Sequence, residues 1–180
     1  MRSIALANQK GGVGKTTSTA NLGASLALLG KRVLMLDIDP QANLSVHFGV
    51  NIFGEEKSLY ELMVDRAKAE DVIRKTAVEG LDLIPSNINL AGAEIELVGV
   101  VGRETVLKEA LGGVMDKYDY VLIDCPPSLG LLTLNAMTTA REIFIPLQTE
   151  FFALQGMSKL LETVEIVRRR LNPNLQVTGI

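Results

Sequence analysis

Short runs of apolar residues, rich in Ile, Val and Leu, recur along the chain. They are continuous and do not alternate with polar residues, which is typical of strands buried on both faces of a parallel sheet. The predicted strands cover residues 4–7, 33–38, 81–84, 120–123, 143–147 and 176–180.

Helical patterns lie between these runs. Leu22, Leu26 and Leu29 repeat with a period near 3.6 after the first strand, and Gly30 indicates where that helix ends. A second helix is predicted near the end of the chain from Leu154, Met157, Leu161, Val164, Val167 and Leu171. Strands that alternate with helices imply right-handed crossovers. The expected fold is therefore α/β, a three-layer sandwich around a mostly parallel, doubly wound sheet.

The chain shows no linker and no internal repeat, so residues 1–180 are expected to form a single domain. Residues 51–75 carry mixed charge with weaker periodicity, which predicts short surface helices. The last predicted strand, 176–180, runs into the C-terminus with no loop or helix after it. We therefore expect this domain to lack its C-terminal part.

Composition and charge narrow the possible classes of function. Of 180 residues, 47% are hydrophobic and 22% are charged, as in ordinary globular proteins. A net charge of -3 gives no strong positive field, so any DNA binding must be local. The sequence shows no membrane segment and no signal peptide, which predicts a cytoplasmic protein. Its single cysteine cannot form an intramolecular disulfide or, by itself, a metal site.

A glycine-rich segment directly follows the first predicted strand and opens the first helix. It consists of Lys10, Gly11, Gly12, Val13, Gly14, Lys15, Thr16 and Thr17. Glycines allow successive backbone N–H groups to turn toward one anion, and the helix N-terminus adds partial positive charge there. Lys15 is expected to reach the β and γ phosphates, and the Thr16 hydroxyl to ligate Mg²⁺. The alternative, a glycine-rich turn with a solvated lysine, does not require this strand–loop–helix context.

Three acidic residues lie at the ends of predicted strands. Asp37 and Asp39 lie at the end of strand 33–38, and Asp124 follows strand 120–123 in the Walker B pattern. Carboxyl ends of parallel strands border the ligand crevice, so these acids are expected to face the phosphates. Asp124 is expected to hold a magnesium-bound water. For Asp39 the alternative is a turn carboxylate, because Asp-Pro dipeptides often begin turns.

The glycine-rich segment departs from the ordinary phosphate-loop pattern, because Gln9 stands where a glycine is usual and Lys10 follows it. With this feature, and with the segments DIDPQ (37–41) and DCPPS (124–128), the chain resembles the deviant Walker A ATPases. These include ParA-type partition proteins, MinD-type division-site proteins and nitrogenase iron proteins. The resemblance implies that Lys10 acts in trans across a nucleotide-sandwich dimer. It further implies that Asp39 orients the attacking water and that Asp37 lies near the magnesium shell.

Two observations separate the branches of this group. An iron protein needs two cysteines per subunit, and this chain has one. The Asp-Pro-Gln segment and the stretch 146–156 look most like the ParA/Soj branch. Within that stretch, Gln148 and Glu150 either line the site or cap the next helix. The segment from Pro126 to Pro127 resembles the second switch of the family.

The resemblance implies an ATPase with catalytic residues Lys10, Lys15 and Asp39. It would use ATP and Mg²⁺, form an ATP-dependent homodimer, and act in chromosome or plasmid partitioning with a ParB-type partner and nonspecific DNA. Such a protein is nucleoid-associated at full length. A positioning ATPase of the MinD type, or for another cargo, and a small-molecule ligase of the dethiobiotin synthetase type remain alternatives.

The remaining reactive or basic side chains favour structural roles. Cys125 is expected to be small and buried, and His47 to lie on the surface or to flank the DIDPQ segment. Arg168, Arg169 and Arg170 are adjacent on a helix, so they cannot form one face; they complement the helix dipole or contact DNA. We expect residues 1–180 to bind ATP and GTP with little discrimination, and DNA weakly or not at all.

Overall fold

The structure of the chain, a computed structural model, describes residues 1–54, 56–148 and 153–180. Its strands are β1 (Arg2–Leu6), β2 (Val33–Asp37), β3 (Arg74–Lys75), β4 (Leu81–Ile84), β5 (Tyr120–Asp124), β6 (Glu142–Phe144) and β7 (Gln176–Gly179). They form one seven-stranded sheet in the order β3-β4-β2-β5-β1-β6-β7. All neighbouring pairs are parallel except β3 and β4.

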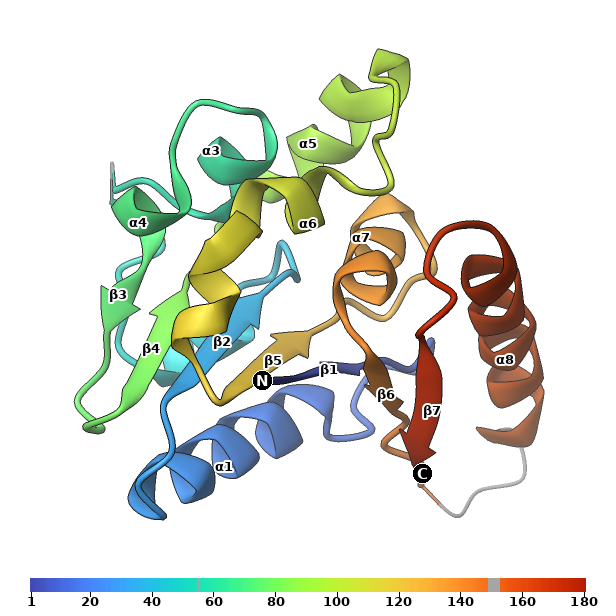
Figure 1. Ribbon diagram of the computed structural model, residues 1–180, viewed down its shortest axis with the longest axis horizontal. Helices are drawn as coiled ribbons and strands as arrows, with labels where there is room; N and C mark the ends of the chain where they lie inside the picture. The colour runs from blue at the N-terminus through green and yellow to red at the C-terminus, as the bar shows by residue number, and fades with distance from the viewer. Residues whose placement is uncertain (55, 149–152) are drawn as a thin grey trace.

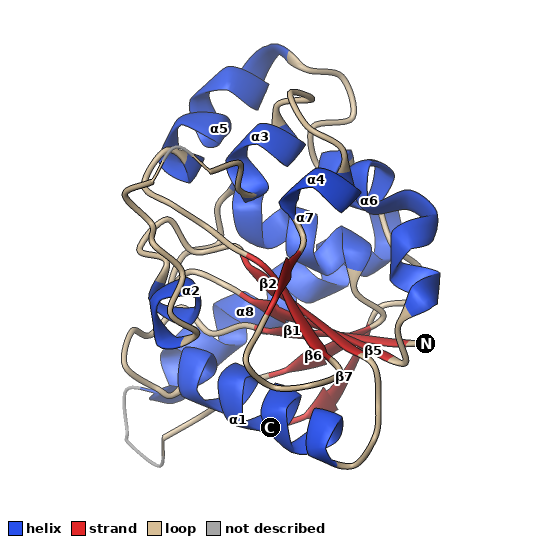
Figure 2. Ribbon diagram, turned by 90° about the vertical axis from the view of Figure 1, so that its left-hand side faces the viewer, coloured by secondary structure: helices blue, strands red, loops and turns tan. Residues whose placement is uncertain are grey.

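Helices cover both faces of this sheet. They are α1 (Lys15–Leu28), α2 (Asn43–His47), α3 (Leu59–Met63), α4 (Ala69–Val72), α5 (Leu90–Glu96), α6 (Val106–Leu111), α7 (Leu131–Thr139) and α8 (Ala153–Arg170), with 3-10 turns η1 (Leu97–Gly99) and η2 (Gly112–Lys117). Helix α1 lies on one face, and α3 to α8 pack on the opposite one (Figures 1 and 2). The expected three-layer, mostly parallel, doubly wound sandwich is confirmed.

The central strand β2 is apolar up to its last residue because it contributes to two separate cores. In β2, Val33 and Met35 belong to the core under α1, while Leu34 and Leu36 belong to the core under α3 to α8. All four side chains are fully buried. Burying one such side chain contributes about 1.5–3 kcal/mol, so both faces of the strand stabilise the sheet.

Two details of the sheet differ from the prediction. The strand expected over 143–147 is β6, which begins one residue earlier and ends at Phe144. Pro146 has no N–H group and cannot extend a hydrogen-bonded ladder, which explains the early end. Strand β3 was not predicted, because it has only two residues, Arg74 and Lys75, and neither is apolar.

The leucine stripe predicted for α1 is not its buried face. Leu29 is 75% exposed, and Leu22 and Leu26 are only partly buried. The buried residues of α1 are instead Lys15, Thr19, Ala20, Gly23 and Ala27. A Cβ atom at Gly23 would lie 2.7 Å from the sulfur of Met35, so the helix runs too close to the sheet for large side chains. Gly30 does end the helix region as expected, with a φ of 76°.

The helices predicted near the end of the chain and in residues 51–75 form, but those in residues 51–75 are more buried than expected. In α8, Leu160, Val164 and Val167 are buried, while the side chain of Leu154 lies outside the description. Residues 51–75 contain α3 and α4, as short as expected. They are not merely surface helices, because Leu59, Leu62, Met63 and Val72 are at most 2% exposed and belong to the main core.

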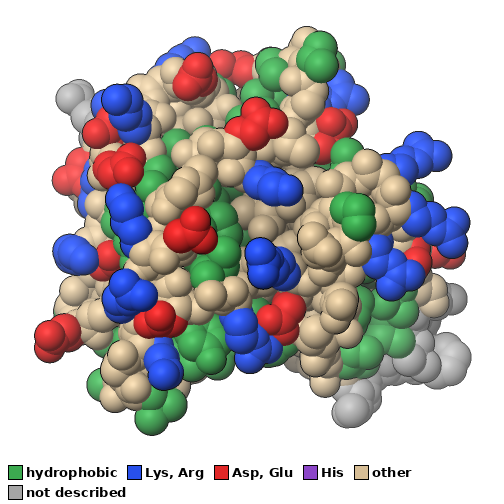
Figure 3. All heavy atoms as spheres, viewed as in Figure 1, with side chains coloured by type: hydrophobic (Ala, Val, Ile, Leu, Met, Phe, Trp, Pro, Cys, Tyr) green, Lys and Arg blue, Asp and Glu red, His purple; other side chains and the backbone are tan. Residues whose placement is uncertain are grey.

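Charged side chains of both signs are interspersed on the face shown in Figure 3. Ion pairs between neighbouring elements of the molecule include Arg32 with Asp119 at 3.1 Å and Lys75 with Asp82 at 2.9 Å. This face therefore presents no patch of a single sign. Among the described residues, no helix is both long and apolar enough to cross a membrane.

Candidate nucleotide-binding site

Strands β2, β5 and β1 lie side by side, and their carboxyl ends meet at one edge of the sheet. Asp124 at the end of β5 is in register with Leu6 of β1 on one side and with Asp37 of β2 on the other. The loop after β1 and the acids after β2 and β5 therefore converge. The structure brings together the predicted phosphate loop, both acids of the DIDPQ segment (37–41) and the Walker B acid.

The loop after β1 has the backbone that a phosphate cradle needs. Gly12 and Gly14 have φ values of 73° and 90°, a left-handed region that other residues rarely adopt. A Cβ at Gly11 or Gly12 would meet nothing within 4 Å, so there is open space beside both glycines. Helix α1 begins at Lys15, and its N-terminus points its unpaired N–H groups at the loop.

Lys15 is buried beside this loop, with 7% of its surface exposed. Its ammonium donates a hydrogen bond to the Lys10 carbonyl at 3.2 Å. It makes no salt bridge within the described residues. Burial lowers the pKa of Lys15, and the carboxyl of Asp124 is the first group that opposes this. A buried cation in this position is suited to an anionic ligand, which would supply the missing counter-charge.

Asp124 has a carboxylate oxygen that the described residues leave unsatisfied. Its Oδ1 accepts a long hydrogen bond from Thr19 Oγ1 at 3.5 Å, whereas Oδ2 is buried and has no hydrogen-bond partner among them. Burial raises the pKa of Asp124 to about 7, against the opposing effect of the Thr16 hydroxyl. Native proteins rarely leave such an atom unpaired, and a cation or its bound water satisfies it. The site thus fits the predicted magnesium ion.

Asp37 is fully buried and anchors the start of the DIDPQ segment (37–41). Its Oδ2 accepts hydrogen bonds from the backbone N–H and the hydroxyl of Ser45, both at 2.8 Å, and its Oδ1 accepts from the Asp39 N–H at 3.2 Å. The Ser45 hydroxyl in turn accepts from the Ser86 N–H at 2.9 Å. Burial raises the pKa of Asp37 to about 6. Its placement near the magnesium shell stays a prediction.

Asp39 forms a turn and also faces the site. Its Oδ1 accepts from the Gln41 N–H at 2.9 Å, and its carbonyl accepts from the Ala42 N–H at 2.9 Å. This confirms the turn role, which sequence reasoning kept as an alternative. The carboxyl also acts electrostatically on both Lys15 and Asp124, so it belongs to the same cluster. Its role in orienting water is not excluded by the turn and stays a prediction.

Gln148 lies against the phosphate loop. Its amide donates to the Gly12 carbonyl at 3.3 Å, and its oxygen accepts from the Lys10 ammonium at 3.4 Å. Of the two roles left open for this residue, the geometry supports lining the site. Glu150, the other residue of that pair, lies outside the described residues.

Two contributors were missed by sequence reasoning. Asn8 accepts from the Lys10 N–H at 3.0 Å and donates to the Pro146 carbonyl at 2.7 Å, which ties the loop to the segment after β6. Ser45 holds Asp37, as described above. Neither residue belongs to a motif of fixed spacing, so the sequence carries no signal for these contacts.

Cys125 and His47 lie as expected, whereas the role of the three adjacent arginines stays a prediction. Cys125 is 1% exposed, and burial raises the pKa of its thiol. His47 is exposed and its ring contacts Phe48. Arg168, Arg169 and Arg170 are exposed, and Arg168 pairs with Glu165 at 2.7 Å.

Comparison with known proteins identifies relatives along nearly the whole chain. The family model described as an AAA domain matches residues 1–177. The sporulation initiation inhibitor protein Soj of Bacillus subtilis is 54% identical, over 98% of this chain and 70% of that protein. The chromosome partitioning protein ParA of Caulobacter vibrioides is 48% identical, over the whole chain and 68% of that protein. The chain spans only 56% of an uncharacterised Mycobacterium tuberculosis protein that is 52% identical.

Solved structures agree with this relationship. The cobyrinic acid a,c-diamide synthase of Mycobacterium smegmatis with bound ADP and magnesium is 43% identical and gives a TM-score of 0.94, over 98% of this chain and 72% of that one. A plasmid partition protein of Borrelia burgdorferi is 30% identical with a TM-score of 0.84, over 99% of this chain and 76% of that one. The glycine loop between β1 and α1, the strand-end acids beside it and the relatives that share nearly all of this chain lead to one conclusion: the protein belongs to the ParA/Soj family of partitioning P-loop ATPases.

Proposed function

We propose that the chain binds ATP with Mg²⁺ at the loop of residues 10–17, dimerises with ATP bound, and hydrolyses it slowly. The observation that carries this proposal is a pair of unsatisfied groups at one edge of the sheet. The buried Lys15 ammonium lacks a salt bridge within the described residues, and the buried Asp124 Oδ2 lacks a hydrogen-bond partner there. A phosphate chain with its metal ion supplies the partner for each.

The proposed roles follow from position. The backbone N–H groups of Gly12 to Thr17 and the Lys15 ammonium hold the phosphates, and Thr16 and Asp124 hold Mg²⁺. When bound, the ion neutralises phosphate charge during hydrolysis. Asp39 orients the attacking water, and Asp37, near the magnesium shell, keeps the turn of Asp39 in place. The bound ADP and magnesium of the Mycobacterium smegmatis structure support this assignment.

The partitioning role is proposed from the relatives. Both Soj of Bacillus subtilis and ParA of Caulobacter vibrioides match this chain over 98% or more of its length. The switch would close as a homodimer, with Lys10 reaching the nucleotide of the second copy. It would bind nonspecific DNA and open when a ParB-type partner stimulates hydrolysis. The protein would work in the cytoplasm, on the nucleoid, in chromosome or plasmid partitioning.

A fluorescent ATP analogue tests the site directly. We expect the wild-type chain to bind it with Mg²⁺, and expect EDTA to weaken binding. Asp124→Asn should remove the magnesium dependence. The matched control is Asp119→Asn, which neutralises a carboxylate paired with Arg32 at the opposite end of β5. Magnesium-independent binding by the wild type, or equal losses in both variants, would count against the proposal.

A second candidate is an ATP-dependent synthase that acts on a small molecule. The observation in its favour is the name of the Mycobacterium smegmatis structure, at 43% identity. Against it, the Soj and ParA relatives are 54% and 48% identical over as much of the chain. The two functions differ in their need for an acceptor. A synthase turns over ATP when its acceptor is present, whereas the switch turns it over without one.

A further inference from the structure

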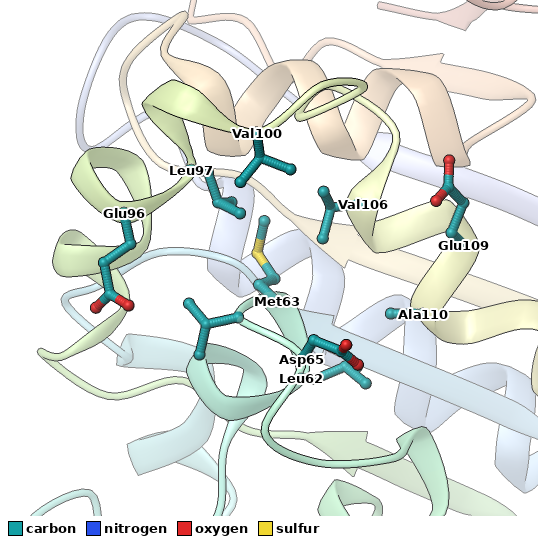
Figure 4. A pocket seen from close by; sticks show the side chains of 10 residues that line it. Leu62, Met63, Asp65, Glu96, Leu97, Val100, Val106, Glu109 and Ala110 are labelled. Carbon is teal, nitrogen blue, oxygen red and sulfur yellow. The ribbon is translucent and has the colours of Figure 1, made fainter.

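The helical layer on the α3 to α8 face contains a groove that no residue of the phosphate loop lines. Its deeper part is a pocket of about 470 Å³ between α3, η1 and α6. Figure 4 shows Met63, Leu97, Val100 and Val106 pointing toward one another in its centre. A shallower hollow of about 300 Å³ continues between α4 and η2, and the two share Leu62, Asp65 and Ala110. The floor of the deeper part is mainly apolar, whereas the shallower part also carries Lys68 and Glu70.

The rim of the deeper part is acidic. Three carboxylates, Asp65, Glu96 and Glu109, line it, and none of its lining residues is Lys or Arg. Glu96 is balanced by Arg66 at 3.2 Å. Within the described residues, Glu109 accepts only from the neutral Thr105 hydroxyl, at 2.8 Å, and neither Glu109 nor Asp65 forms an ion pair. Two uncompensated negative charges therefore lie beside an apolar pocket.

The groove is connected to the nucleotide site through the fold. In α6, which forms one wall, the Leu107 N–H donates to Asn135 Oδ1 of α7 at 3.0 Å. Helix α7 follows the segment after Asp124, and its Leu132 N–H donates to Glu94 of α5 at 3.4 Å. Both α5 and α6 are thus hydrogen-bonded to the helix that follows the Walker B acid.

We propose that this groove binds a short segment of a partner protein, with an apolar anchor residue in the pocket and a Lys or Arg next to it. The apolar floor fits the anchor, and Asp65 and Glu109 attract the cation. Only the idea that this partner stimulates hydrolysis rests on the proposed function. Peptide binding in the groove depends only on the shape and charge of the groove.

Methionine methyl signals report on the groove without disturbing it. The chain has 6 methionines, of which Met63 lines the pocket and Met35 lies in the other core, under α1. Protein labelled with ¹³C at the methionine methyl groups is titrated with the peptide Gly-Lys-Leu-Leu-Lys-Gly. We expect the Met63 signal to shift in a saturable way and the Met35 signal to stay in place. An unchanged Met63 signal, or an equal response at Met35, would overturn the proposal.

Matched variants test the chemistry of the groove. Asp65→Asn keeps a residue that tolerates the φ of 58° found there and removes the charge. Together with Glu109→Gln it should weaken the peptide about two- to twentyfold, as two exposed ion pairs do. Ala110→Phe should fill the pocket and weaken peptide binding more than the two charge changes do. Glu162→Gln on α8 is the control and should change nothing; an effect as large as that of the rim variants would mean nonspecific charge attraction.

Two further measurements distinguish peptide binding in the groove from misfolding and from self-association. Each variant is checked for binding of the fluorescent ATP analogue, which should match the wild type and shows that the chain is folded. If the peptide does not bind while nucleotide binding is intact, the proposal for the groove is wrong and the proposed function is unaffected. Sedimentation without nucleotide tests the other occupant, a second copy of this chain. A dimer that dissociates in the Ala110→Phe variant would show that the groove is a self-association interface and would overturn the partner proposal.

Discussion

Asp37 and Asp124 stand directly opposite each other, in register, at the carboxyl ends of the neighbouring strands β2 and β5. Both are buried, and burial raises the pKa of Asp37 to about 6 and that of Asp124 to about 7. Each negative charge also disfavours the other. The folded protein without nucleotide therefore holds two carboxylates that resist ionisation together, at the place where a cation would relieve them.

This pairing predicts how stability depends on pH. Both groups bind protons more tightly when folded than when unfolded, so the free energy of unfolding falls as the pH rises from about 4 to about 7. Each unit of pKa shift is worth about 1.4 kcal/mol, so we expect a loss on the order of 2 kcal/mol or more. Chemical denaturation of the nucleotide-free protein across this range measures it.

Asp124→Asn provides the control for this pH effect. The neutral amide cannot ionise, so the variant should lose less stability over the same range and be more stable than the wild type near pH 8. Asp119, whose pKa the Arg32 side chain lowers to about 2, acts below this range and does not mask the effect. A wild-type stability that rises between pH 4 and 7 would contradict the burial of these charges.

Replacing Lys15 and replacing Lys10 should have different effects on nucleotide binding and dimerisation. Lys15→Ala should abolish ATP binding, because a charge-assisted contact in a preorganised loop is worth about 1.5–3 kcal/mol. Lys10→Ala should retain monomer binding but lose ATP-dependent dimers, because Lys10 holds the nucleotide of the second copy. Titration with a fluorescent ATP analogue and sedimentation with ATP separate the two effects. Equal loss of binding in both variants would argue against the role in trans.

Asp39→Ala should trap the nucleotide rather than release it. The Thr16, Lys15 and Asp124 contacts remain, so ATP binds and dimers persist while turnover falls. The turn contacts of Asp39 add a second expectation. Asp39→Asn keeps an oxygen for the Gln41 N–H, so it should be as slow as Asp39→Ala but more stable to heat. Loss of ATP binding in both variants would show that Asp39 builds the site rather than acts on water.

The close packing of α1 gives a prediction independent of the nucleotide. Gly23→Ala would place a Cβ atom 2.7 Å from the Met35 sulfur. Such overpacking typically lowers the free energy of unfolding by about 1–3 kcal/mol. The higher helix propensity of Ala returns about 1 kcal/mol, so a small net loss is expected. Leu29→Ser, at a side chain 75% exposed, should leave stability nearly unchanged. Thermal unfolding compares them; a larger loss for Leu29→Ser would restore the predicted leucine stripe.

Which features of this protein can be predicted from the sequence depends on how local each feature is. Gly12, Gly14 and Lys15 work through the backbone of one contiguous loop, so their spacing alone predicts the cradle. Asp124 was predicted because a parallel sheet brings its strand ends to one edge. These features need only the order of elements along the chain.

Features set by close approach between elements escaped prediction. The distance between α1 and the sheet decides that Gly23 rather than Leu29 faces inward, and no periodicity encodes that distance. Ser45 reaches Asp37 only because α2 folds back over the end of β2. Asn8 likewise gains its second partner, the Pro146 carbonyl, from a segment 138 residues away. Such contacts depend on packing in three dimensions.

Phosphate release from ATP by this chain with no acceptor molecule present is the most direct test of the proposed ATPase switch. The measurement compares the wild type with Lys15→Ala and Asp39→Ala, with and without EDTA. The switch predicts slow release by the wild type that requires Mg²⁺, and none above background from either variant. Release that begins only when a small-molecule acceptor is added, or that persists in Lys15→Ala, would contradict it.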